Sequence, residues 1–266
     1  MGFGAGLERA PLWLLALLLF GSMVVAREVG SYLRRRTKAT DAGADKDSDA
    51  FAMTSVLGLL ALLIGFTFSI ALSRYEARRE LVVKEANAIG TTWLRMQLLD
   101  APERAHMENL LRRYVDTRVA FGEAASPEAE VEQYKRAEGL QNELWSGLMA
   151  AIAPFRDTPR ASLLVTTMNE SIDLAAERFA TRQAHIPPRI LRMLVLFALL
   201  AAGMVGYERG NQRRATTLLF VLLTLAATLV VDLDRPSTGM VNVPQDPMLD
   251  LRASIQPAGP PAPVRD

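Results

Sequence analysis

The stretch that decides the fold, residues 54–73, reads TSVLGLLALLIGFTFSIALS and contains no charged side chain. At 1.5 Å per residue, about 20 helical residues cross the hydrocarbon core of a bilayer, so this stretch predicts a membrane-spanning helix. Three further apolar runs cover residues 12–26, 190–206 and 216–231, and Arg192 is the only charged residue among them. The sequence therefore predicts an all-α integral membrane protein with four transmembrane helices.

The composition agrees with this class. The 266-residue chain is half apolar and has a mean hydropathy of +0.13. Its 30 basic and 29 acidic side chains give a net charge of +1. A nucleic-acid-binding protein would show a strong excess of clustered basic residues, so nucleic acid is excluded as a partner and membrane lipid is expected instead. The absence of cysteine excludes a disulfide-built domain, thiol redox chemistry and Cys-ligated zinc.

The first apolar run has two interpretations. It is short and ends in Val24-Val25-Ala26, which is also typical of a cleaved signal peptide. Against cleavage, the charges of Glu8 and Arg9 cancel before the run, whereas an export signal prefers a net positive start.

The basic residues leave the orientation open. With four spans, loops 27–53 and 207–215 share one face, and their many basic side chains favour placing that face in the cytoplasm. However, Arg74 and Arg78 directly follow the second span and Arg189 precedes the third, so the opposite face is basic as well.

The segment between the second and third spans is predicted to be helical. No proline occurs between Thr54 and Ala101, so one helix of about 46 residues, or about 69 Å, is expected to project from the membrane. Three more helices are expected to begin near Ala101-Pro102, Ser126-Pro127 and Thr158-Pro159, because proline is favoured in the first turn. Each predicted helix carries an apolar stripe at helical spacing. The stripes are Val82, Ala86, Ile89, Trp93 and Met96; Met107, Leu111 and Tyr114; Leu144, Leu148 and Ile152; and Met168, Ile172, Ala175 and Phe179.

These patterns divide the chain into five parts. The parts are residues 1–53 with the first transmembrane helix and a basic loop; 54–100 with the second transmembrane helix and its long aqueous extension; 101–188 with a helical extramembrane segment; 189–233 with a hairpin of transmembrane helices three and four; and 234–266 with a proline-rich tail. After Val241 the tail is expected to be disordered or extended.

No residue pattern indicates catalysis. His106 and His185 are the only histidines and form no metal-binding motif, and no phosphate loop, nucleophile elbow or dinucleotide fingerprint occurs. We therefore expect no enzyme activity, no catalytic residue, no metal site and no cofactor. A solvated helix face is the favoured interpretation of the aqueous carboxylates; these are Glu128, Glu130, Glu132, Glu138 and Glu143.

The spans contain no acidic residue or histidine near their centres, which argues against a proton relay or an ion-coupled pump but permits a passive pathway. Small residues recur at four-residue spacing on two spans, where they let helices approach closely. They are Ala61, Gly65 and Ser69 on the second span and Ala198, Ala202 and Gly206 on the third. We expect them to serve packing within the bundle.

The end of the fourth span reads Val231-Asp-Leu-Asp-Arg-Pro236, and in a four-span topology it shares a face with Arg74 and Arg78. A carboxylate at the membrane edge is stabilised by a nearby cation. We therefore expect Asp232 or Asp234 to pair with Arg74 or Arg78.

Residues 65–81 read GFTFSIALSRYEARREL and resemble the second-span signature of bacterial bestrophins. The matching elements are Gly65-Phe66, Arg74-Tyr75, Glu76-Ala77-Arg78, Glu85 and Asn87. Most of residues 51–251, including Asp232-Leu-Asp-Arg-Pro236, is similar to a family of uncharacterised bestrophin-like membrane proteins.

Bestrophins are pentameric anion channels whose second-span helices line an apolar neck, with most of the protein in the cytoplasm. The resemblance implies a homo-oligomer, an anion as partner, Leu62 and Phe66 as neck residues, a cytoplasmic segment between spans two and three, and a bacterial inner membrane. Gly58 departs from the bulky apolar residue expected there, and the aromatic pair before Glu76 is reduced to Tyr75 alone with a one-residue length difference. The pore register therefore stays open, and packing within the bundle or contact with lipid is an equal alternative for Leu62 and Phe66.

Two functions remain compatible with the sequence. The first is an oligomeric membrane protein that conducts anions, such as chloride, passively through an apolar constriction. The second is a non-conducting scaffold or regulatory subunit that binds a partner through the apolar stripes of its extramembrane helices.

Overall fold

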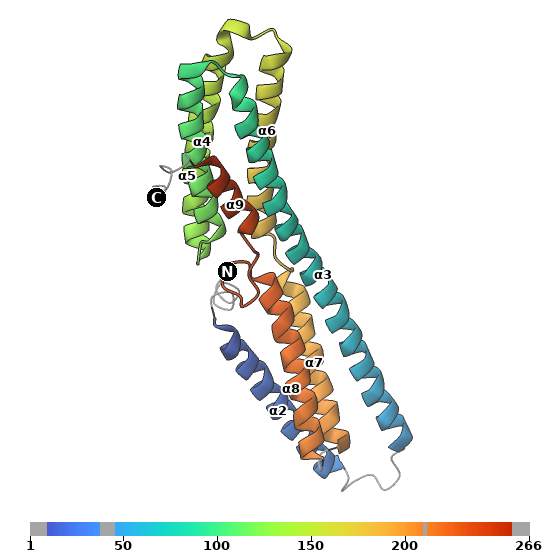
Figure 1. Ribbon diagram of the computed structural model, residues 1–266. Helices are drawn as coiled ribbons and strands as arrows, with labels where there is room; N and C mark the ends of the chain where they lie inside the picture. The colour runs from blue at the N-terminus through green and yellow to red at the C-terminus, as the bar shows by residue number, and fades with distance from the viewer. Residues whose placement is uncertain (1–9, 38–45, 210–211, 257–266) are drawn as a thin grey trace, which may run out of the picture. The chain divides into compact units, whose positions relative to one another are not determined.

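The computed structural model describes residues 10–37, 46–209 and 212–256. These residues form helices and their connections and include no strand, so the predicted all-α fold is confirmed. The helices are α2 (Leu12–Thr37), α3 (Lys46–Arg95), α4 (Ala101–Gly122), α5 (Pro127–Ile152), α6 (Pro159–Gln183), α7 (Pro188–Arg209), α8 (Arg213–Asp234) and α9 (Asp246–Ile255), with short 3₁₀ turns at Met96–Leu98 and Ala153–Phe155 (Figure 1). Four helical stretches of this part of the chain are long and apolar enough to cross a membrane, and they contain the four predicted spans.

The chain forms two compact units. Unit 1 comprises residues 1–75 and 185–241, and unit 2 comprises residues 76–184 and 242–266. The 50-residue helix α3 passes from one unit to the other without a break, as the absence of proline predicted. Its second half as an aqueous extension remains a prediction.

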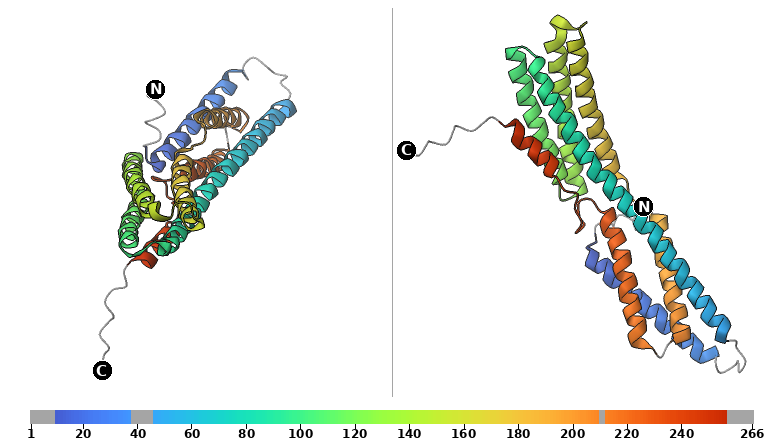
Figure 2. Two further views of the ribbon diagram at one scale, coloured as in Figure 1. Left: turned by 90° about the horizontal axis from the view of Figure 1, so that it is seen from above. Right: turned by 45° about the vertical axis from the view of Figure 1, so that its right-hand side comes forward.

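In unit 1, α2 packs along α7 and also contacts α8, and the three helices lie side by side in Figures 1 and 2. The core is apolar and includes residues of α3. Its fully enclosed members include Met23, Leu60, Ala202 and Phe220.

Glycine permits the close contact between α2 and α7. A side-chain carbon at Gly30 would overlap the carbonyl oxygen of Gly203, and one at Gly206 would overlap the backbone of Arg27. In lipid, helices associate through close packing rather than through hydrophobic burial, so such glycines stabilise the pair. The predicted packing role of the stripe Ala198, Ala202 and Gly206 is confirmed, since all three are buried.

The corresponding expectation for the second span is wrong. Ala61, Gly65 and Ser69 are exposed in this chain, and a side-chain carbon built at Gly65 meets no atom within 4 Å. Small side chains permit close packing, but they do not specify which helix packs against them. No described helix of this chain packs against these three residues.

The basic loop predicted at residues 27–53 is shorter than expected. Helix α2 continues to Thr37 because no proline interrupts it, and α3 already begins at Lys46. Arg34 therefore lies on a helix, where its Nη1 donates to the carbonyl oxygen of Tyr207 at 2.6 Å. The last carbonyls of a helix lack partners within the helix, so Arg34 caps the end of α7. Residues 38–45 lie outside the described part of the chain.

Unit 2 begins its helices where the sequence predicted. Helices α4, α5 and α6 start at Ala101, Pro127 and Pro159. Ser126 and Thr158 cap α5 and α6, because their hydroxyl oxygens accept hydrogen bonds from the backbone of the first turn at 3.2 and 3.3 Å. The predicted apolar stripes face the interior of the unit. Their fully buried members are Val82, Ala86, Ile89, Met96, Met107, Leu111, Tyr114, Leu144, Leu148, Ile152, Met168 and Ala175.

The prediction that the chain is disordered or extended after Val241 is wrong in part, because Asp246–Ile255 form α9. Met248, Leu251 and Ile255 recur at helical spacing and are buried, and α9 packs against α4. Pro247 does not break this helix, because it occupies the first turn, where proline is tolerated. Residues 257–266, which carry most of the prolines of the tail, lie outside the described part of the chain.

Substituting Gly206→Ala is expected to destabilise unit 1 by roughly 1–3 kcal/mol or more, because the added carbon overlaps the backbone of Arg27. Gly21→Ala is the matched control, since a side-chain carbon there meets nothing within 4 Å and alanine is favoured in helices. Thermal unfolding of the purified protein in detergent measures both. Equal unfolding temperatures for the two variants would contradict the proposed close contact.

Candidate functional site

The membrane half of α3 has a covered face and an uncovered face. Met53, Leu60 and Thr67 are buried within unit 1. Leu62 and Phe66, the predicted neck residues, are 54% and 62% exposed. They are four residues apart and so lie on one side of the helix. The uncovered face also carries Leu59 and Ile70. In a membrane this face must contact lipid, another subunit or a pore, since no described residue of its own chain covers it.

The end of α8 is held by its aspartates. Asp232 Oδ1 accepts the amide of Met240 at 2.5 Å and thereby closes the turn that follows α8. A side-chain carbon at Gly239 would lie 2.6 Å from the same oxygen, so this turn requires glycine. Asp234 Oδ1 accepts the amide of Ile186 at 2.9 Å, and its Oδ2 lies 3.4 Å from His185 Nδ1. The two carboxylates thus join the end of α8 to the residues just before α7.

The predicted arginine partners lie on α3. Arg78 is buried and donates to the carbonyl oxygens of Thr181 at 3.4 Å and Ala184 at 2.7 Å. The Nε of Arg74 is buried and has no hydrogen-bond partner among the described residues. The pairing of Asp232 or Asp234 with either arginine stays a prediction.

Unit 2 contains a buried charge cluster, which we define as Glu85, Arg118, Glu130, Arg178 and Arg182. Glu85 of α3 is fully buried and binds two arginines. Its Oε1 accepts from Arg118 Nε of α4, and its Oε2 accepts from Arg178 Nη1 of α6 at 2.5 Å. One carboxylate therefore joins three helices through charge-assisted hydrogen bonds, the strong class of protein hydrogen bond.

The cluster extends to α5 and to the segment before α9. Arg182 Nε donates to Glu130 Oε1 at 2.7 Å, and Arg178 Nη2 donates to Gln245 Oε1 at 2.6 Å. The solvated-face interpretation is therefore wrong for Glu130, which is 2% exposed. It is confirmed for the other four carboxylates, which are exposed: Glu128, Glu132, Glu138 and Glu143.

The ring of Phe121 lies at the centre of the three arginines. The guanidinium carbon of Arg118 lies 4.5 Å from the ring centroid, and those of Arg178 and Arg182 lie 5.2 Å from it. An aromatic face attracts cations within about 6 Å. Phe121 thus offsets part of the repulsion among the three like charges.

Burial and ion pairing shift the pKa values of Glu85, Arg178 and the neighbouring Tyr114, all of which lie outside the predicted spans. Burial would raise the pKa of Glu85, but Arg118 and Arg178 together hold it below its ordinary value of 4.5. Burial also lowers the pKa of Arg178, which lies near the like charges of Arg118 and Arg182. Burial raises the pKa of Tyr114 to about 12.

The apolar stripes alone did not predict this cluster. The sequence nevertheless indicates it, because charged residues interrupt or continue two of the stripes. Glu85 falls in the same apolar stripe as Val82 and Ile89, and Arg178 and Arg182 continue the stripe that contains Ala175. A charged residue inside an apolar stripe indicates either a break in the stripe or a buried ion pair, because an unpaired buried charge is very costly. Acidic and basic residues placed in this way on neighbouring helices therefore indicate buried partners.

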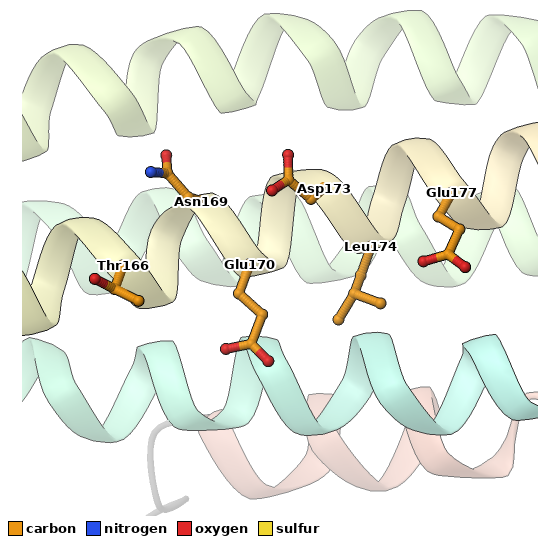
Figure 3. Close-up of a pocket in the computed structure, with 6 residues that line it drawn as sticks. All are labelled: Thr166, Asn169, Glu170, Asp173, Leu174 and Glu177. Carbon is orange, nitrogen blue, oxygen red and sulfur yellow. The ribbon is translucent and has the colours of Figure 1, made fainter.

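A groove of about 420 Å³ lies along α6. Its lining residues are Thr166, Asn169, Glu170, Asp173, Leu174 and Glu177, all on one helix. Figure 3 shows that these side chains project to both sides of the α6 ribbon and do not converge on one point. In the described residues, no three histidine, aspartate or glutamate side chains are grouped to hold a metal ion. We interpret the groove as a solvated helix face.

Comparison with known proteins identifies the relatives of this chain. The family model of the bestrophin-like domain matches residues 7–248. No curated protein sequence matches.

Solved structures with the same fold include the bacterial bestrophin homolog from Klebsiella pneumoniae, with a TM-score of 0.61 and 16% identity over 90% of this chain and 94% of that chain. A variant of that protein with a tryptophan replaced by alanine gives a TM-score of 0.65 and 14% identity over 93% of this chain and 96% of that one. At this identity, the likeness shows the fold.

Substituting Glu85→Gln is expected to lower the stability of the protein by about 3–5 kcal/mol, because it leaves Arg118 and Arg178 buried without a counter-charge. The pKa of Glu85 is lowered in the folded state, so its contribution is present above pH 4.5 and is lost as the pH falls through the folded pKa. Thermal unfolding measured from neutral to acid pH should therefore show a smaller acid loss in the variant. The control Glu132→Gln removes an exposed carboxylate paired with Arg136, and it should change stability by about 0.5 kcal/mol or less. Equal losses for the two variants would count against the cluster.

Two substitutions at Asp232 distinguish its observed role, which is to close the turn after α8, from its predicted role, which is to pair with Arg74 or Arg78. Asn keeps an oxygen that can accept the Met240 amide, whereas Ala removes it. If the turn is what Asp232 stabilises, Asp232→Ala should cost about 1–3 kcal/mol and Asp232→Asn much less. If pairing with Arg74 or Arg78 dominates, both variants should lose stability equally. Thermal unfolding in detergent distinguishes these outcomes.

Proposed function

The chain belongs to the bestrophin-like family, and from this premise we propose that it is a homo-oligomeric membrane protein that conducts anions, such as chloride, passively through a pore lined by α3. The observation that carries the proposal is the uncovered apolar face of α3. Leu62 and Phe66 lie on that face, more than half exposed, on a helix whose opposite side is buried in unit 1. Side chains so placed are available to a neighbouring subunit or to a central pathway.

The small residues beside this face support assembly through α3. Ala61, Gly65 and Ser69 are exposed, and two of them directly adjoin Leu62 and Phe66 in the sequence. Small side chains let helices approach closely in lipid, where close packing replaces the hydrophobic effect as the source of association. We propose that these residues contact α3 of a second copy while Leu62 and Phe66 narrow the pathway. A ring of identical subunits, a pentamer by resemblance, satisfies both contacts at every interface.

The proposed pathway is passive, and the side chains that line it select which ions pass. An apolar constriction admits ions only when it is wetted, and basic side chains near its end favour anions. Arg74 and Arg78 follow the apolar run of α3 and supply that charge. The aspartates at the end of α8 are bound to backbone amides, so their charges are partly offset.

The proposed location is the bacterial inner membrane, with the segment between the second and third spans in the cytoplasm. The family resemblance supports this orientation. Basic residues also flank that segment on both sides, with Arg74 and Arg78 after the second span and Arg189 before the third, so the positive-inside rule does not oppose this orientation.

The alternative function, a non-conducting scaffold, required the apolar stripes of the extramembrane helices to be available to a partner protein. In unit 2 those stripes are used internally, since Val82, Ile89 and Met96 are at most 1% exposed. Trp93 is half-buried, and the guanidinium carbon of Arg112 lies 4.7 Å from its ring centroid. This observation favours the channel over the scaffold.

Chloride flux from proteoliposomes tests the proposal. Wild-type protein should release chloride, and Leu62→Ala or Phe66→Ala should change the flux severalfold because each alters the width and hydrophobicity of the neck. Leu225→Ala is the matched control, since Leu225 is an apolar residue of α8 with 61% exposure and should leave flux unchanged. Absence of flux from a well-folded wild-type oligomer would reject conduction. Flux that responds equally to all three substitutions would reject the assignment of the neck.

A further inference from the structure

The buried charge cluster leaves part of one arginine without a partner. Arg118 has no exposed surface, and its Nε is taken by Glu85. Its Nη1 and Nη2 are buried and have no hydrogen-bond partner among the described residues. Buried polar groups are almost always hydrogen-bonded, and a charged donor without an acceptor is especially unfavourable. The geometry therefore requires an acceptor at the outer end of this guanidinium group.

The charge balance of the cluster identifies the kind of acceptor. Three arginines face two carboxylates, which leaves one positive charge uncompensated. Both oxygens of Glu85 are already engaged, Glu130 pairs with Arg182, and Gln245 adds an acceptor without charge. Arginine does not release its proton in proteins, so the excess charge persists. A water molecule would supply an acceptor alone, whereas a monovalent anion would supply both an acceptor and the missing charge.

A second donor lies on the same face of α4. Tyr114 is four residues before Arg118 and is also fully buried. Its hydroxyl oxygen accepts a hydrogen bond from Gln141 Nε2 at 3.0 Å, which leaves the hydroxyl proton to be donated elsewhere. Burial raises the pKa of Tyr114 to about 12, so this proton is retained at neutral pH.

We propose that unit 2 binds a small monovalent anion of the halide class between the Nη groups of Arg118 and the hydroxyl of Tyr114. The residues of the site belong to α4 and not to the proposed neck on α3, and its occupancy does not depend on whether the protein conducts. Divalent anions such as sulfate are disfavoured, since only one positive charge is uncompensated. Bound anion stabilises the packing of α3, α4, α5 and α6 by completing the charge cluster.

Thermal unfolding of the full-length protein in sodium bromide and in sodium gluconate, at equal ionic strength and pH, tests the site. An anion that binds only the folded state stabilises it by mass action. At a bromide concentration about ten times the dissociation constant, the folding equilibrium shifts about 11-fold, which raises the Tm by about 3–6 °C. Tyr114→Phe should reduce this bromide effect, and Arg118→Gln should abolish it.

The control Arg113→Gln replaces an arginine of the same helix that is exposed and pairs with Glu143, so it should keep the full bromide effect. If Arg118→Gln does not fold, Tyr114→Phe still tests the site, because it keeps all the charges of the cluster. Crystals grown in bromide supply a direct readout, and an anomalous peak beside Arg118 is expected. The proposal is overturned if that position holds only water, or if wild type and Tyr114→Phe respond to bromide equally.

Discussion

The carboxylate of Glu85 is the interaction on which unit 2 depends. It holds Arg118 of α4 and Arg178 of α6 at once, so a single side chain of α3 determines how three helices meet. Two buried charges repay their desolvation only when the geometry is correct and the remaining polar atoms are bonded. If any of these helices slid along its neighbours, a hydrogen bond of Glu85 would break. Because the cluster is buried, water could not take the place of the lost partner. The cluster thereby favours one packing arrangement over the many that apolar stripes alone would allow.

Unit 1 is stabilised by a different kind of contact. Lipid tails are as apolar as leucine, so burial of leucine against leucine contributes little there, and shape decides which helices associate. Gly30 and Gly206 let α2 and α7 come close enough for backbone contact, while Arg34 bonds the last carbonyls of α7. The contacts within unit 1 leave one face of α3 uncovered. This face is also the surface on which the proposed oligomer and pore are built.

Several features were predictable from short stretches of sequence. The helix starts at Ala101, Pro127 and Pro159 follow from local cap and proline chemistry, and the apolar stripes of unit 2 follow from helical spacing. Two of the errors share a cause. The charged neighbours of Glu130 favour a solvated face, and the prolines around Met248 and Leu251 favour an extended tail. In each case a local pattern is outweighed by a distant partner.

The sequence by itself determined that the chain is helical, that it has four apolar spans and that one long helix joins a membrane segment to a polar one. These properties depend on residues within a few turns of each other, and the thickness of the bilayer sets the length of a span. Only the tertiary structure decided which charged residues are buried, since Glu85 meets partners 33 and 93 residues away. It also decided which face of α3 is uncovered. Burial is a property of the neighbours that a side chain acquires on folding, and the spacing of residues along one helix does not specify those neighbours.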